Sequence, residues 1–210
     1  MIEKAKKIAI QAGRKVLLLR KRSLTFTSKK RIGDFATEAD LFSEEIILSE
    51  LRKYFPSHNF ISEEAGKLDN GSEYTWVIDP LDGTIPYSSG LPIFGISIGL
   101  LKNLQPQLGV INMPEERWLV WAEKAKGAYG NGKRLKVSKK NDLKECVVAV
   151  EYGYMGSRRV EAQKLLLPII DNVRYPPALA SSVASCAYVG AGVLMDTSIV
   201  PTPGILWQGV

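Results

Sequence analysis

Two carboxylates stand three positions apart in the segment DPLDGT, at residues 79–84 of the chain. The apolar stretch TWVI comes directly before them, so Asp79 is expected at the end of a buried strand. The proline of the segment fixes φ and its glycine allows a sharp turn, which could direct Asp79, the carbonyl of Leu81 and Asp82 toward one point. The alternative interpretation is an ordinary polar turn, because Asp, Pro and Gly all favour turns.

Two further acids, Asp40 and Glu63, stand out beside this pair, and Glu63 directly follows a short predicted strand, NFIS. Like charges that are crowded together repel, so a cluster of carboxylates needs a compensating cation. Ligands that are all oxygen atoms suit Mg²⁺, Mn²⁺ or Ca²⁺ better than Zn²⁺. His58, the only histidine, is interpreted as a surface or helix-end residue and is given no role.

The elements that must position these acids begin with two predicted helices. Apolar and small residues from Ala5 to Leu19 recur at helical spacing and predict a first helix with one buried face. The segment TSKKRIGDFATEAD after it is predicted to be a polar loop. Thr37 is expected to cap a second helix, with Asp40 at its third position as in a capping box, and Pro56 is expected to stop that helix.

The pattern changes after the second helix and predicts a sheet. Short apolar or alternating runs predict strands at NFIS, YTWVI, GISIGLL, LGVIN, RWLVWA and CVVAV, and Asn131-Gly132 indicates a hairpin. The segment RRVEAQKLLLPII is predicted to be helical as far as Pro168, and SSVASCAYVGAGVLM to be a helix of small residues that packs closely on a sheet. Helices and strands do not alternate regularly, which favours an α+β fold built in layers.

Composition and charge narrow the possible classes of protein. The 210 residues are 45% hydrophobic, enough for one sizeable core or two closely fused lobes. The net charge of +6 fits either a solvated surface or attraction for an anionic ligand. The basic clusters are not interleaved with aromatic residues, so no nucleic-acid partner is expected.

The cellular setting is also an expectation from the sequence. No apolar run approaches the ~20 residues that span a bilayer, and the basic N-terminus lacks the features of a signal peptide, so no membrane association is expected. Cys146 and Cys186 are expected to be reduced, as in a cytoplasmic protein.

Several segments, in order and spacing, resemble the inositol monophosphatase family of metal-dependent, lithium-sensitive phosphatases. They are GDFATEAD, ISEEAG, WVIDPLDGT, GISIGL, GAYGNGKRLKVS and SSVASCAYVGAG. The resemblance covers nearly the whole chain and implies the layered αβαβα sandwich of sugar phosphatases, with the last strand and helix missing. It implies an N-terminal lobe over residues 1–143, carrying two helices, an antiparallel sheet and the metal site. A shortened C-terminal α/β lobe over residues 144–210 would be fused with it into one catalytic unit.

The resemblance also implies a role for each matching residue. Mg²⁺, or Mn²⁺, would be the cofactor. By position, Glu63, Asp79 and the carbonyl of Leu81 would hold a first ion, and Asp79 and Asp82 would share a second. Asp40 and Thr84 would activate water, Gly83 and Thr84 would bind phosphate, and Lys29, Asp34 and Glu64 would lie at outer positions of the site. Ala180, Ser181 and Ser182 would form the helix start that contacts the substrate, where the family usually begins with glycine.

Two departures from the family pattern affect the expected activity. The loop from Ile85 to Gly90 lacks the usual NF and histidine, and Trp207-Gln208 stands where the family has Trp-Asp, near an expected shortened C-terminus. The second ion is therefore expected to bind weakly. The expected function is Mg²⁺-dependent hydrolysis of a small phosphorylated metabolite, such as inositol monophosphate, by a homodimer. Alternative substrates are fructose 1,6-bisphosphate, histidinol phosphate and a 3′-phosphoadenosine nucleotide, and a further alternative is a non-catalytic phosphate-binding protein.

Overall fold

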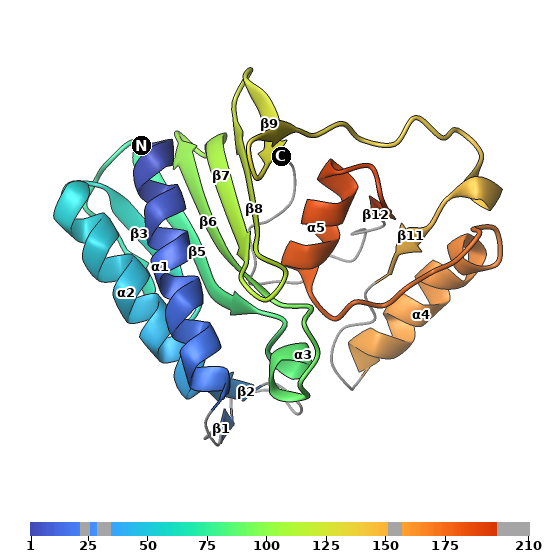
Figure 1. The fold of residues 1–210 in the computed structure, drawn as a ribbon, viewed down its shortest axis with the longest axis horizontal. Helices are drawn as coiled ribbons and strands as arrows, with labels where there is room; N and C mark the ends of the chain where they lie inside the picture. The colour runs from blue at the N-terminus through green and yellow to red at the C-terminus, as the bar shows by residue number, and fades with distance from the viewer. Residues whose placement is uncertain (22–25, 29–34, 151–156, 197–210) are drawn as a thin grey trace.

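Five layers of helix and sheet make up the protein, as the computed structural model shows for residues 1–21, 26–28, 35–150 and 157–196 (Figure 1). Along the chain the elements are α1 (Ile2–Arg20), β1 (Phe26–Ser28), β2 (Phe35–Thr37), α2 (Glu38–Tyr54), β3 (Asn59–Ser62), β4 (Gly66–Leu68), β5 (Tyr74–Asp82), α3 (Thr84–Ser88), β6 (Gly95–Lys102), β7 (Gln105–Met113), β8 (Trp118–Glu123), β9 (Gly127–Gly130), β10 (Lys133–Arg134), the 3₁₀ helix η1 (Leu143–Glu145), β11 (Val148–Ala149), α4 (Ser157–Ile170), α5 (Ser182–Gly190) and β12 (Met195–Asp196).

An eight-stranded sheet forms the second layer, in the order β10-β9-β8-β7-β6-β5-β3-β4. All neighbouring strands in it are antiparallel except β3 and β5, which run parallel. The middle of β5 and most of β6 are buried at every position, and not only at alternate ones. Strands buried on both faces require a covering layer on each side.

Helices supply that cover on both faces (Figure 1). On one face α1 packs against α2 and against strands β6 to β8, while α2 packs on β5. On the other face α5 contacts β6 and β7 and also the parallel pair β11–β12, beyond which lies α4. This order of layers confirms the α+β, αβαβα sandwich expected from the sequence.

The two long N-terminal helices agree with their sequence patterns. The buried residues of α1 include Ala5, Ile8, Ala12, Val16 and Leu19, which are the predicted apolar face. The second helix ends at residue 54, two positions before the proline. Among the described residues, no helix combines the length and the apolar character needed to cross a membrane.

Three local predictions from the sequence were wrong. The segment predicted as a polar loop contains β2 and most of β1, which pair antiparallel from Phe26↔Thr37 to Ser28↔Phe35. Strand β5 does not end at Asp79 but continues to Asp82. Helix α4 continues through Pro168 to residue 170, because a proline in the last turn leaves only one helical hydrogen bond unmade.

His58 also differs from its prediction as a surface residue. Its side chain is buried, and its Nδ1 accepts a hydrogen bond of 3.0 Å from Nε1 of Trp76. Its ring stacks on Phe55 and Tyr74, with ring centroids 5.1 and 4.9 Å apart. The histidine therefore joins the turn after α2 to β5 and has a structural role.

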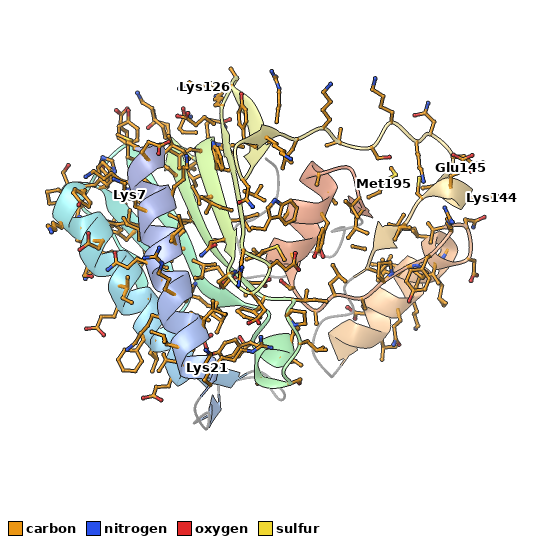
Figure 2. All side chains as sticks on the ribbon, viewed as in Figure 1. Lys7, Lys21, Lys126, Lys144, Glu145 and Met195 are labelled. Carbon is orange, nitrogen blue, oxygen red and sulfur yellow. The ribbon has the colours of Figure 1, made fainter. Side chains whose placement is uncertain are left out.

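Several lysines of the described chain lie on the outside of the molecule. Lys7, Lys21, Lys126 and Lys144 are exposed: Lys7 lies in the first half of α1 and Lys21 directly after its end, Lys126 lies between β8 and β9, and Lys144 lies in η1 (Figure 2). These four lysines are therefore better explained as part of a solvated surface than as a site that attracts an anionic ligand.

Candidate active site

A bulge in β5 brings two carboxylates to the same face of the sheet. Asp79 pairs with Ser97 of β6, whereas Asp82 pairs with Gly95, so three steps along β5 match two steps along β6. Residues three apart in a regular strand point to opposite faces, and one extra residue restores the same face. Pro80 lies inside the bulge, where its missing N–H leaves no ladder hydrogen bond unmade.

Glu63 lies beside Asp79 because β3 and β5 are parallel neighbours. The last register pair is Ser62↔Ile78, and the residue after each of these is an acid, so the two acids lie next to each other where the pairing of β3 with β5 ends. Burial raises the pKa of Asp79 well above its usual range, and the charges of Asp82, Glu63 and Asp40 raise it further. The four acids selected from the sequence therefore lie within electrostatic reach of one another.

Asp79 carries the clearest signature of a ligand site. The residue is 7% exposed, and the backbone N–H of Leu81 partly opposes the rise of its pKa. Its Oδ1 has no hydrogen-bond partner within the described part of the chain. A buried carboxylate oxygen without a partner loses the solvation that it would have in water, so it favours either a proton or a cation.

Asp82 is joined to the start of α5 across the interior of the molecule. Its Oδ2 accepts hydrogen bonds from the Ser181 hydroxyl and from the backbone N–H of Val183 at 2.9 Å. Burial raises the pKa of Asp82, while the donors on Ser181, Val183 and Ser182 oppose that rise. The free N–H groups at a helix start thus hold this carboxylate and place α5 against the bulge.

Asp40 and Thr84 meet at the same place from two other elements. Asp40 is 1% exposed in the first turn of α2. The Thr84 Oγ1 is 3.4 Å from Asp40 Oδ1 and 3.2 Å from the carbonyl oxygen of Leu81. Both distances are long for a hydroxyl hydrogen bond, and one hydroxyl proton serves only one of these acceptors well at a time.

Two backbone positions next to the acids have left-handed conformations. Gly83 has φ of 80°, and a Cβ there would lie 2.9 Å from the Ile93 carbonyl oxygen and 3.1 Å from the Ser181 Cβ. Only glycine satisfies both conditions without displacement. Ala180 has φ of 53°, so alanine is strained where the family usually has glycine.

Sequence reasoning missed two buried residues of α2 that help to build the site. Ser43 Oγ donates a 2.6 Å hydrogen bond to the carbonyl of Pro80 and so fastens α2 to the bulge. Glu44 accepts hydrogen bonds from the turn that carries Glu63 and Glu64. Both stand three or four positions after Asp40, on the same face of the helix, and that spacing could have indicated them.

The remaining predicted residues are only partly placed. Lys29, Asp34, Trp207 and Gln208 lie outside the described residues. Glu64 lies in the turn after β3, where its backbone N–H donates to Glu44.

The donor atoms fit a hard divalent cation, although they are not gathered into a finished cage. Among the described residues, no three acidic, histidine or cysteine side chains form a group that could hold a metal ion. Carboxylates that repel one another do not converge without positive charge between them. The Asp79 Oδ1 and the Asp82 and Glu63 carboxylates offer oxygen atoms only, which is the donor set that Mg²⁺ and Mn²⁺ prefer.

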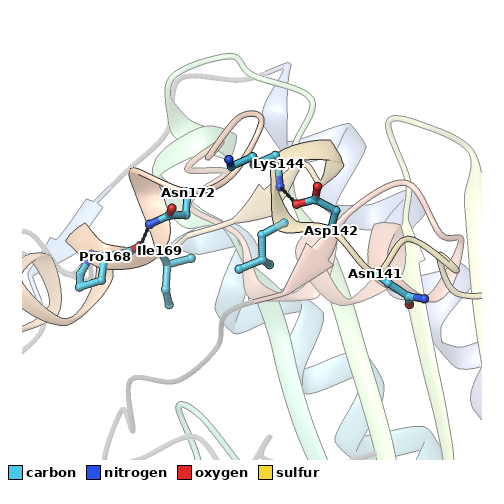
Figure 3. Close-up of a pocket in the computed structure, with 7 residues that line it drawn as sticks. Asn141, Asp142, Lys144, Pro168, Ile169 and Asn172 are labelled. Atoms are coloured by element: carbon cyan, nitrogen blue, oxygen red, sulfur yellow. Dashed lines mark hydrogen bonds between the residues drawn. The ribbon is translucent and has the colours of Figure 1, made fainter.

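A groove of about 460 Å³ lies away from these acids, between η1 and α4 (Figure 3). Among its described lining residues Asp142 is the one carboxylate, and this side chain accepts a hydrogen bond of 2.9 Å from the backbone N–H of Lys144. The amide of Asn172 donates to the carbonyl of Pro168 at 2.8 Å. Asp142 and Asn172 thus make local capping contacts, and the described residues of the groove bring no group of acids together as β5 does.

Comparison with known proteins gives a consistent result across almost all of the chain. The model of the inositol monophosphatase family matches residues 1–196. A fructose-1,6-bisphosphatase/inositol-1-monophosphatase of Aquifex aeolicus (strain VF5) is 40% identical over 174 residues, which make up 80% of this chain and 64% of the relative. Inositol monophosphatase 2 of Mus musculus is 36% identical over 202 residues, or 90% of this chain and 68% of the relative. The chain thus spans less than two thirds of the A. aeolicus protein.

Solved structures resemble the protein over the same region. The IMPase of Thermotoga maritima has a TM-score of 0.83 and 32% identity, covering 92% of this chain and 73% of its own. The extragenic suppressor protein suhB of Bartonella henselae has a TM-score of 0.85 and 29% identity, covering 91% of this chain and 74% of its own. The similarity therefore extends from the local motifs to the arrangement of the layers.

Proposed function

Because the chain belongs to the inositol monophosphatase family, we propose that it is a metal-dependent phosphomonoesterase that hydrolyses a small phosphorylated metabolite. The observation that carries the proposal is the buried Asp79 carboxylate, whose Oδ1 has no partner in the described structure and whose neighbours are three further acids. Such an arrangement is unfavourable by itself and becomes favourable when a cation is bound.

We assign the cation to Mg²⁺, with Mn²⁺ as a substitute, because the candidate ligands are all oxygen atoms. Glu63, Asp79 and the carbonyl of Leu81 would hold a first ion, and Asp79 with Asp82 a second. Bound ions of this kind would activate water, neutralise phosphate charge and stabilise the leaving oxygen.

Thr84 and Asp40 would orient the attacking water and accept its proton. Thr84 Oγ1 stands between Asp40 Oδ1 and the Leu81 carbonyl oxygen, so its single proton can be directed to either. A water that donates to Thr84 Oγ1 would pass its proton through this hydroxyl to Asp40 Oδ1. The 3.4 Å between the two oxygens should shorten when substrate is bound, as catalytic hydrogen bonds commonly do.

The same corner of the structure would bind the phosphate group. The chain turns at Gly83 and enters α3 at Thr84, and the start of α5 lies against it through Asp82 and Ser181. Backbone N–H groups at this turn and at the start of α3 are suited to anions, whereas those at the start of α5 already hold Asp82. Ala180 and Ser182 flank Ser181 and would contact the rest of the substrate.

The relatives favour a sugar or inositol phosphate as the substrate. The A. aeolicus relative is named for both fructose 1,6-bisphosphate and inositol 1-phosphate hydrolysis. Fructose 1,6-bisphosphatase activity is therefore the second candidate for this chain. A phosphate-release assay with inositol monophosphate, fructose 1,6-bisphosphate and a 3′-phosphoadenosine nucleotide, each over a range of Mg²⁺ concentrations, distinguishes the candidates.

A matched pair of variants tests whether the activity belongs to this site. Asp40→Asn should reduce phosphate release strongly, because an amide does not accept the water proton, whereas the exposed Glu45→Ala on the same helix should release phosphate at the wild-type rate. Equal rates in Asp40→Asn and wild type would contradict the assignment. If wild type releases no phosphate from any ester but binds phosphate, the protein is the non-catalytic family member considered from the sequence.

We also propose that the protein acts as a homodimer. Light scattering at tens of micromolar concentration should give twice the monomer mass of 23.2 kDa, and a monomer at that concentration would contradict the proposal.

A further inference from the structure

Glu44 is a buried carboxylate that does not belong to the acid cluster. Its side chain lies in α2 and is 7% exposed. Its Oε1 accepts three hydrogen bonds, from the Ser62 hydroxyl and from the backbone N–H groups of Glu64 and Ala65 at 3.0 and 2.9 Å. All three donors belong to the end of β3 and the turn that follows it, so one oxygen atom of α2 organises this turn.

The turn needs support that the sheet does not supply. Strands β3 and β4 close a hairpin at the pair Ser62↔Gly66, which leaves Glu63 to Ala65 as its turn. Strand β4 is exposed along its whole length and is the last strand of the sheet. Strand β3 is held by its pairing with β5, but an exposed edge strand of three residues gives the far side of the turn little rigidity, and contacts from α2 supply support there.

The hydrogen bonds to Glu44 enclose Glu63 from both sides. Ser62 precedes Glu63 in the chain, and Glu64 and Ala65 follow it, so the backbone of Glu63 cannot rotate without breaking at least one of these bonds. Glu44 also stands four positions after Asp40, on the same face of α2. The start of α2 therefore places Asp40 in the acid cluster and, through Glu44, holds the turn that carries Glu63.

We propose that Glu44 is a positioning residue: it fixes the turn after β3 so that the Glu63 carboxylate points toward Asp79, and it thereby sets the affinity of the site for a divalent cation. This inference rests on the proposed function, because it concerns the same metal site. Residues that orient metal ligands typically change metal affinity or activity by about 10–100-fold when they are replaced.

The test measures Mn²⁺ binding to the full chain by isothermal titration calorimetry, well below the melting temperature of each variant. Glu44→Ala removes the acceptor and should weaken Mn²⁺ binding by about 10–100-fold. Glu44→Gln keeps a carbonyl oxygen in place of Oε1 and should recover most of the lost affinity. Glu45→Ala is the matched control, because it removes the adjacent carboxylate on the exposed side of α2 and should bind Mn²⁺ like wild type.

The outcomes separate this inference from the proposed function. If wild type and Glu44→Ala bind Mn²⁺ equally well, Glu44 only stabilises the fold and the inference is wrong, even if the variant melts at a lower temperature. If Glu44→Ala does not fold, Ser62→Ala decides the matter: weakened Mn²⁺ binding supports the inference, and unchanged binding overturns it. If wild type itself binds no Mn²⁺, the proposed metal site fails and the inference fails with it.

Discussion

Replacing Gly83 with alanine should destabilise the protein through two effects that the structure separates. The first is backbone strain, because φ is 80° at this position. The second is steric, because the added Cβ would lie 2.9 Å from the Ile93 carbonyl oxygen, closer than ordinary contact allows. Gly90, just past the other end of α3, provides a matched control, with φ of 87° and no atom within 4 Å of the added Cβ.

The expected magnitudes follow from these two effects. Left-handed backbone costs an L-residue roughly 1–2 kcal/mol, and the lower chain entropy of unfolded alanine returns about 0.4–1 kcal/mol, so Gly90→Ala should lose about 1 kcal/mol. Overpacking adds roughly 1–3 kcal/mol, so Gly83→Ala should lose about 3 kcal/mol. At about 3 °C per kcal/mol for a chain of this size, the melting temperatures should fall by roughly 3 °C and 9 °C.

Circular dichroism melts and urea unfolding of the two variants and wild type provide the measurement. The difference between the variants matters more than either value, because the strain common to both cancels. Equal losses at the two positions would refute the steric argument and would mean that the loop after Asp82 relaxes freely. A neutral Gly90→Ala would instead refute the estimate of backbone strain.

Three further predictions follow from the described contacts. Ala180→Gly should stabilise the protein by about 1 kcal/mol, because relief of the strain at φ 53° exceeds the entropy that glycine adds to the unfolded chain, and a fall in melting temperature would contradict this. Asp79→Asn should raise the melting temperature at neutral pH without divalent cations and abolish any rise caused by Mg²⁺. The pKa of Asp79 is raised by burial and neighbouring acids, so the folded state binds a proton more readily than the unfolded state, and metal-free wild type should lose stability as pH rises through the raised pKa. Burial lowers the pKa of His58, so as pH falls below about 6.5 the unfolded state binds a proton at this imidazole before the folded state does, and wild type should lose stability. His58→Gln should lose less stability over the same pH range. Equal pH profiles of the two proteins would contradict the role of His58 as acceptor for Trp76.

Much of the fold was predictable because its signals are local. The buried face of α1 follows helical spacing, and the left-handed Asn131 and Gly132 form the turn that their sequence indicates. The mixture of helices and strands gave the α+β class, and the resemblance to a family gave the order of layers. Strands β1 and β2 escaped prediction because each is only three residues long and depends on pairing with the other.

In the candidate site, too, the local features were predictable from the sequence and the long-range ones were not. The residue types and spacing of Asp40, Glu63, Asp79 and Asp82 were enough to predict an oxygen-ligand site, because carboxylates after apolar strands are visible in the sequence. The bulge that turns Asp79 and Asp82 to one face depends on the register of β5 against β6, which no local pattern states.

Only the tertiary structure decided which groups support these acids. The start of α5 holds Asp82 through residues about a hundred positions later in the chain. Glu44 reaches the turn after β3 across the space between α2 and the sheet. A sequence lists the donors and acceptors, but a hydrogen bond forms between the groups that folding brings within about 3 Å, and for residues far apart in the chain the packing of the layers decides which these are.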